Sequence, residues 1–126
     1  MAHTVTYNFE LGIIETSAEG KLTLSEAKEI ISKITECAIA NNCFLCLSDY
    51  RECIMEMSTF QIYDIPMILS NIVTSVGLRP NQFKRAIIVE KGFRDFNFYE
   101  TVSLNSGQKI RLFREIDEGK KWLLEK

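Results

Sequence analysis

The stretch KRAIIVEKGFRDFNFYETVSLNSGQKIRLFREIDEGKKWLL, residues 84–124, decides the fold of this chain of 126 residues. It opens with a short, mostly β-branched apolar run at 86–89, which is typical of a strand covered on both faces. A helical pattern follows and ends at the turn-forming Asn-Ser-Gly of 105–107, and the alternating residues 108–113 then predict a second, less buried strand. A final helix completes the unit. This order of strand, helix, strand and helix predicts a parallel sheet covered by helices, an α/β layer sandwich.

The chain begins with a different pattern, which predicts antiparallel pairing. Residues 4–9 alternate apolar and polar side chains, and Gly12 precedes Ile13-Ile14-Glu15-Thr16, a pattern that suits two strands of a hairpin. A turn is expected at Gly20-Lys21. We therefore expect one domain, residues 1–126, with a mixed and mostly parallel sheet of about five strands that starts with a hairpin, together with about four helices.

Two capping boxes predict the first two helices. T-x-x-E at 23–26 and S-x-x-Q at 58–61 each pair an N-cap hydroxyl with an acceptor side chain three residues later. Between these helices we expect a strand at 43–48 followed by a polar loop at 49–52. Pro66 lacks an amide donor, so the second helix is expected to kink or restart there.

Charge and hydropathy exclude several classes of function. The chain carries 15 basic and 17 acidic residues and a net charge of −2, whereas a dedicated nucleic-acid binder needs a concentrated basic face. The cations between Arg79 and Arg94 are interspersed with Glu90 and Asp95, and we interpret them as a solvated rim.

Membrane insertion and secretion are not indicated. No apolar run approaches the roughly 18 residues that a membrane span needs. The first residues, Met-Ala-His-Thr, show neither the basic start nor the apolar core of a signal peptide. A cytoplasmic location is therefore expected.

The four cysteines are expected to be buried and inert. Cys43 and Cys46 are spaced as in a redox motif, but a strand over 43–48 would place them on opposite faces, about 10 Å apart and too far for a disulfide or a shared metal. Cys37 and Cys53 form no second such pair, and His3 is the only histidine. We therefore expect neither a metal site nor a bound cofactor.

A catalytic motif is also missing from the sequence. His3 near the terminus makes a nucleophile–histidine pair improbable, and neither a P-loop nor a G-x-G-x-x-G loop is present. Asp49 is the best remaining acid–base candidate, although an acid at the end of a strand more often ties down a loop. A non-catalytic protein is the expectation.

The order of two strands, helix, strand, helix, strand, helix, strand and helix, together with the ending of the chain, resembles a known fold. The ending runs from Tyr99-Glu100-Thr101-Val102 through Gly107 to Ile110-Arg111-Leu112-Phe113, Glu115-Ile116-Asp117-Glu118-Gly119 and Trp122-Leu123. It resembles the SpoIIAA-like branch of the STAS (sulfate transporter and anti-sigma factor antagonist) fold over nearly the whole chain. Gly119 stands where a small alanine is usual, and it would allow the last helix to approach the sheet closely.

The resemblance implies a regulatory or protein-interaction module. Anti-sigma factor antagonists of this fold carry a phosphorylated serine just before a helix, and Ser58 falls at that position with Thr59 beside it. Met57 replaces the usual acidic residue and Phe60 the usual glycine. Ser58 is also a good N-cap by itself, so a cap alone is the favoured interpretation, with a phosphoacceptor as the alternative.

Two loops are expected to meet at the carboxyl edge of the sheet, where α/β proteins usually bind partners. The partner surface would comprise Asp49, Arg51, Ser58 and Thr59, and its candidate partners are another protein or a second copy of this chain. An alternative function is a carrier or sensor for a small apolar or anionic ligand, by distant similarity to CRAL-TRIO lipid-exchange domains. Its site would consist of Lys91, Phe93, Arg94 and Phe96.

Overall fold

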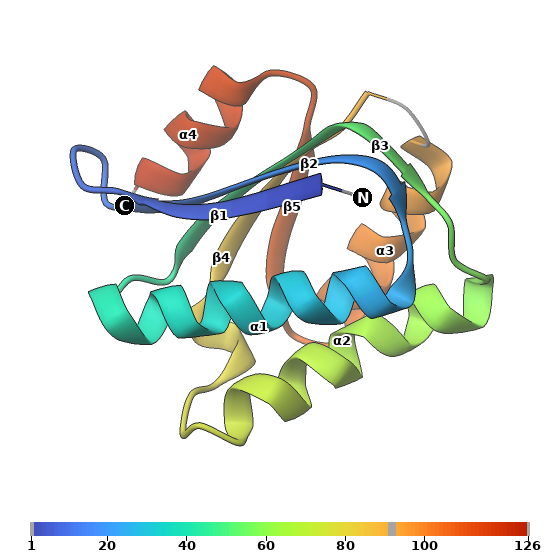
Figure 1. Cartoon of the computed structure of the whole chain (residues 1–126), viewed down its shortest axis with the longest axis horizontal. Helices are drawn as coiled ribbons and strands as arrows, with labels where there is room; N and C mark the ends of the chain where they lie inside the picture. Colours follow the sequence, from blue (N-terminus) through green and yellow to red (C-terminus); the bar gives the residue numbers. More distant parts are fainter. Residues whose placement is uncertain (1, 91–92, 126) are drawn as a thin grey trace.

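The computed structural model describes residues 2–90 and 93–125, with the side chain of Phe93 excepted. In chain order the elements are β1 (Ala2–Asn8), β2 (Ile13–Leu22), α1 (Leu24–Asn41), β3 (Leu45–Met55), α2 (Thr59–Thr74), a short 3-10 turn (Pro80–Gln82), β4 (Lys84–Ile88), α3 (Phe93–Asn105), β5 (Lys109–Phe113) and α4 (Ile116–Leu124) (Figure 1).

The five strands form one mixed sheet in the order β1-β2-β3-β4-β5. β1 and β2 pair antiparallel as a hairpin, and each later neighbour is parallel. The α/β layer sandwich predicted from the sequence is therefore confirmed. Sequential parallel strands joined through helices place those helices on one face of the sheet, because crossovers of one hand all pack on the same side.

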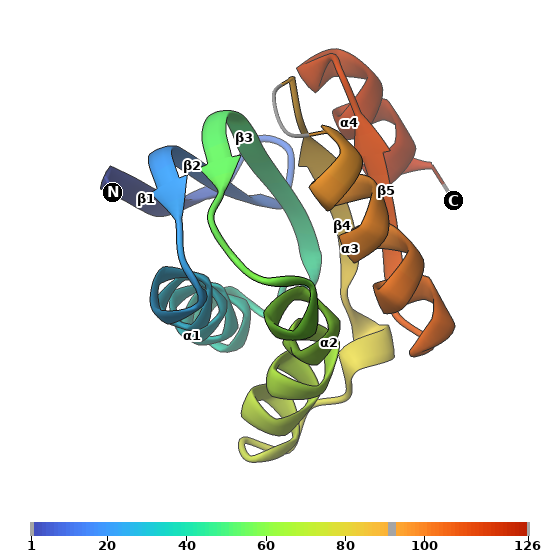
Figure 2. The same ribbon diagram turned by 90° about the vertical axis from the view of Figure 1, so that its right-hand side faces the viewer.

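That arrangement gives the protein two cores. The larger lies between the sheet and α1, α2 and α3, while the smaller lies between the sheet and α4. Figure 2 shows α1 and α2 side by side, with α4 away from them. The larger core draws on alternate residues of the strands, such as Ile14, Cys46 and Ile87, and the smaller core takes the opposite set, such as Ile13, Leu47 and Ile88.

Gly119 allows α4 to lie close to the sheet, as the sequence predicts. A Cβ atom at this position would lie 2.8 Å from Cδ1 of Ile88 and 3.1 Å from Cδ1 of Leu47. Trp122 packs against Phe113 beside this contact, and the Lys84 ammonium donates a hydrogen bond of 2.5 Å to the Trp122 carbonyl. The missing side chain of Gly119 thus sets the distance between α4 and the strands.

The largest difference from the sequence prediction is the length of β3. We expected a strand at 43–48 and a loop at 49–52, but β3 runs to Met55 and stays paired with β2 as far as Leu22–Met55. Residues 49–52 look like a loop because most of them are polar. In the structure this part of β3 buries only one face, so Tyr50 is buried while its neighbours Asp49 and Arg51 are partly exposed. A register shift opposite residues 17–19 accommodates an extra residue on β3.

The structure differs from the sequence prediction at three further places. Gly20 and Lys21 belong to β2 and do not form a turn. α2 continues through Pro66 without restarting, with the proline buried in the core. α3 begins at Phe93, so Asp95 lies in its first turn and is not the cap.

The four cysteines are free, and three of them are buried. Cys43 precedes β3 and lies in the same core cluster as Cys46, so the opposite-face argument was wrong although no disulfide forms. Burial raises the pKa of Cys46 to about 12 and that of Cys53 to about 11. Both thiols are therefore protonated and unreactive at neutral pH.

Candidate functional site

The carboxyl edge of the sheet holds a cluster of charges that the sequence partly predicted. Asp49 is level with Ile88 at the end of β4, and Ile88 is level with Phe113 at the end of β5. Arg51 stands two residues beyond Asp49 on the same face of β3. Its Nε and Nη2 atoms donate to the two carboxylate oxygens of Asp49 at 2.9 and 2.8 Å. We call this pair the edge clip.

The edge clip is electrostatically satisfied. The guanidinium of Arg51 holds the pKa of Asp49 below its ordinary value, chiefly through those hydrogen bonds. The same bonds raise the pKa of Arg51, with smaller contributions from the carboxylates of Glu115 and Glu90. A carboxylate held ionised in this way is a poor general base, and an arginine among three carboxylates is a poor anion receptor. The edge clip therefore fixes the Arg51 side chain on β3 beside Asp49, the last position where β3 pairs with β4, and offers little chemistry.

Ser58 is the N-cap of α2, as the sequence predicts. Its hydroxyl oxygen accepts a hydrogen bond of 3.1 Å from the Gln61 amide, and Gln61 Oε1 accepts one of 3.0 Å from the Ser58 amide. Ser58 and Thr59 are both exposed. The hydroxyl is thus accessible while it completes the capping box.

The structure does not place all the predicted edge residues at one level. β3 continues for six residues after Asp49, its last partner position with β4, so the strand ends at Met55, about 20 Å beyond Asp49, and Ser58 follows three residues later. Arg94 is exposed at the start of α3. Lys91 and the side chain of Phe93 lie outside the described residues. The edge clip and Ser58 are therefore separate features of the surface.

Phe96 is a core residue, contrary to its predicted place at a ligand mouth. It is fully buried, and its ring stacks on Tyr50 with centroids 5.9 Å apart. The stack joins the extended end of β3 to α3. Phe96 is therefore unable to contact a ligand at the surface, but its side chain lines the internal cavity described below.

Sequence reasoning missed an apolar stripe on the outer face of α2. Phe60, Tyr63 and Met67 are 84%, 62% and 64% exposed, and they follow the i, i+3, i+7 spacing of one helix face. We call these three residues the α2 stripe. The signal was present, because α2 carries large apolar residues outside its buried face and contains no lysine or arginine. An ordinary amphipathic helix would turn a polar face to solvent.

The α2 stripe borders a surface groove of about 380 Å³. Tyr63 and Met67 line one wall, and Val102 and Asn105 of α3 line another. The stripe begins two residues after Ser58. A modification of Ser58 would therefore change the end of this apolar surface.

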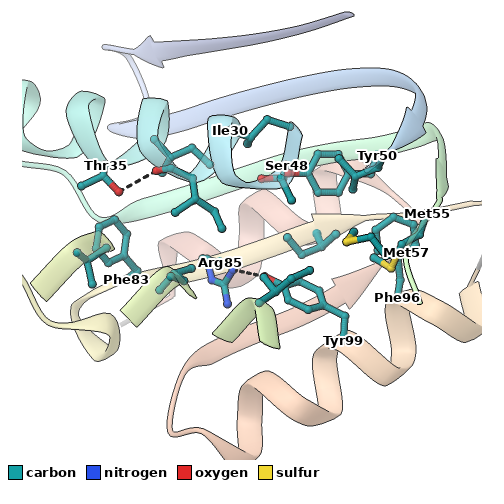
Figure 3. Close-up of a pocket in the computed structure, with 18 residues that line it drawn as sticks. Ile30, Thr35, Ser48, Tyr50, Met55, Met57, Phe83, Arg85, Phe96 and Tyr99 are labelled. Atoms are coloured by element: carbon teal, nitrogen blue, oxygen red, sulfur yellow. Dashed lines mark hydrogen bonds between the residues drawn. The ribbon is translucent and has the colours of Figure 1, made fainter. Parts of the chain in front are cut away.

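A second feature is an internal cavity of about 50 Å³ between the sheet and α1, α2 and α3 (Figure 3), whose lining includes Phe96. Its wall is mainly apolar. The polar members of that wall are Thr35, Ser48, Tyr50, Arg85 and Tyr99.

Arg85 is the unexpected member of this wall. It was predicted to lie on a solvated rim, but it is only 7% exposed. The reason is the register of β4, in which Arg85 shares a face with Ile87, and that face points to the larger core. Residues 86–89 are all apolar, so the sequence pattern does not show on which face of β4 Arg85 lies.

Comparisons with known proteins support the fold. No family model matches the chain, and no curated protein matches its sequence. The chain is similar to the crystal structure of an uncharacterized protein of the DUF3478 family with a SpoIIAA-like fold from Shewanella loihica PV-4, with a TM-score of 0.57 and 19% identity. The match covers 97% of this chain and 92% of that one. No helix in the described part of the chain is long and apolar enough to span a membrane. The protein has a SpoIIAA-like fold.

Proposed function

We propose that this protein is a non-catalytic regulatory module that binds a protein partner through the α2 stripe, with Ser58 at the end of the contact surface. The observation that carries the proposal is the exposure of the α2 stripe. Large apolar side chains that cluster on a surface usually mark an interaction site. Aromatic residues and methionine are also enriched in protein interfaces.

The size of the α2 stripe suits a protein partner. The exposed fractions of Phe60, Tyr63 and Met67 correspond to about 400 Å² of surface. One side of a standard interface buries about 800 Å², so the α2 stripe would supply roughly half of it. The adjoining groove offers the remainder through residues of α3.

Ser58 gives this surface a means of regulation. A phosphate on its hydroxyl would add close to two negative charges at the amino end of α2, where the helix dipole favours them. α2 supplies no lysine or arginine to neutralise those charges. A phosphate there would therefore remain available to attract or repel a partner.

The experiment compares partner binding by wild-type protein and by the double variant Phe60→Ser/Tyr63→Ser. Partners are captured from the host organism with immobilised protein and identified by mass spectrometry, and self-association is measured by analytical ultracentrifugation. We expect the double variant to lose a partner that wild type retains, or to lose the dimer if the partner is a second copy. Ile39→Ser is the matched control, because Ile39 is 52% exposed on α1, away from the stripe.

The proposal is wrong if both variants retain every partner and the same oligomeric state as wild type. The intact mass of protein purified from its host tests the regulatory part separately. We expect an added phosphate that Ser58→Thr retains and Ser58→Ala loses. An unmodified mass under all growth conditions would leave Ser58 as a helix cap only.

A further inference from the structure

Arg85 is a buried cation whose protein partners are all neutral. Its Nη1 atom donates a hydrogen bond of 2.6 Å to the Tyr99 hydroxyl, and its Nη2 atom donates one of 2.9 Å to Oε1 of Gln108. Gln108 is held in turn, because its Nε2 atom donates to the Pro66 carbonyl at 2.9 Å. Within residues 2–90 and 93–125, no carboxylate forms an ion pair with Arg85.

This arrangement is costly without an anion. Removing a guanidinium from water costs several kcal/mol, and buried charges are normally paired with an opposite charge. The two neutral partners fix the direction of the guanidinium but do not balance its charge. A guanidinium also has more N–H donors than these two bonds use. The protein therefore presents an oriented cation with donors to spare.

Arg85 borders the internal cavity described above (Figure 3). The rest of the wall is mainly apolar, and three helices contribute to it, for example through Ile30 of α1, Leu69 of α2 and Phe96 of α3. One water needs about 10–15 Å³ of such space, so the cavity of about 50 Å³ holds roughly three to five groups of that size. An occupant must therefore be small.

We propose that this cavity binds a small monocarboxylate, with the carboxylate on Arg85 and a short apolar body against the helices. A carboxylate matches the planar fork of a guanidinium, which can donate two parallel hydrogen bonds. The Tyr99 hydroxyl lies beside the same position and has a proton to donate to the carboxylate, because its oxygen accepts from Arg85. This site goes beyond the partner surface on α2 and involves none of the α2 stripe.

The chemistry of the wall favours this class over other anions. A phosphate carries nearly two charges and needs more donors than one arginine and a few hydroxyls supply. Thr35 is already engaged, since its hydroxyl donates to the Ile31 carbonyl at 2.8 Å. A neutral apolar molecule would fill the space but leave the Arg85 charge uncompensated. One negative charge and an apolar remainder suit the site best.

Two half-buried residues give the site an entrance. Ile34 of α1 and Met57, just before α2, both belong to the cavity wall and are partly exposed. Methionine changes rotamer readily, so Met57 is suited to move aside. Met57 also adjoins Ser58, which places this entrance next to the amino end of α2.

The test is calorimetric titration of the full chain with acetate and propionate, and with the neutral probes acetamide and propionamide. We expect the carboxylates to bind at least ten-fold more tightly than the matching amides. Arg85→Met should weaken propionate binding at least ten-fold. Because this variant removes two core hydrogen bonds, its fold is checked by circular dichroism.

A second variant keeps the proposal testable if Arg85→Met does not fold. Ala27 belongs to the cavity wall and lies on a helix, so Ala27→Leu fills the cavity and retains helix propensity. We expect Ala27→Leu to abolish propionate binding, whereas Ile39→Ser, outside the cavity, should leave it unchanged. Equal affinity for propionate and propionamide, or propionate binding that survives Ala27→Leu, would overturn the assignment. So would a failure of both carboxylates to bind wild-type protein at 10 mM or below.

Discussion

The close approach of α4 to the sheet makes a quantitative prediction for Gly119→Ala. In isolation, glycine to alanine inside a helix gains about 1 kcal/mol of helix propensity. Here the new Cβ would lie 2.8 Å from Cδ1 of Ile88, a fully buried side chain, so the packed core must shift. Overpacking of this kind costs about 1–3 kcal/mol. We expect the variant to be destabilised by about 1 kcal/mol, because the clash exceeds the gain in propensity.

The double variant Gly119→Ala/Ile88→Val tests this reasoning directly. Ile88→Val deletes the Cδ1 methyl that the new Cβ would strike, and by itself it should cost about 1 kcal/mol through the cavity it leaves. In the double variant the Cβ occupies part of that space. We therefore expect a stability within about 0.5 kcal/mol of wild type, whereas simple addition of the two single effects would give a loss of about 2 kcal/mol.

Urea unfolding provides the measurement, followed through the fluorescence of Trp122. Trp122 is the only tryptophan and lies on α4, so its signal reports the element that is perturbed. If the dependence of the unfolding free energy on urea concentration keeps the same slope, a change of about 1 kcal/mol in that free energy gives a measurable shift of the unfolding midpoint. If the two substitutions add within about 0.4 kcal/mol, the contact between Gly119 and Ile88 does not limit the packing of α4.

Three further predictions concern single residues. Ser58→Ala should lower the free energy of unfolding by about 1 kcal/mol, while Ser58→Thr should retain most of it, because only the hydroxyl caps α2; urea unfolding of both variants decides this. Asp49 has a lowered pKa in the folded state, so its contribution to stability is complete above the unfolded pKa of about 3.9 and is lost as the pH falls through the folded value. Asp49→Asn should remove the contribution of Asp49 to the fall of the urea unfolding midpoint at acid pH. An unchanged dependence of the midpoint on pH would contradict the stabilising role of the Asp49–Arg51 pair. Among the thiols, half-buried Cys37 should react with iodoacetamide at pH 8 before the buried Cys46 and Cys53, as peptide mass mapping would show, and early labelling of Cys46 would contradict its raised pKa.

The candidate sites were only partly predictable from the sequence. Ser58 was found because its capping box is a local signal, complete within four residues. Asp49 and Arg51 were singled out as well, but as loop residues, since the continued pairing of β3 with β2 joins residues 33 positions apart in sequence, such as Glu19 and Glu52. The α2 stripe was missed because exposure depends on which face of α2 the rest of the fold covers.

The sequence by itself determined the elements whose signals are local: the hairpin around Gly12, the capped starts of α1 and α2, and the order of strands and helices that gives a SpoIIAA-like fold. Those signals act over a few residues, through backbone hydrogen bonds and the period of the apolar pattern. Only the tertiary structure decided that Arg85 is buried beside a cavity and that the α2 stripe faces solvent. Both outcomes depend on strand register and on the packing of distant helices, which place a side chain inside or outside whatever its own polarity favours.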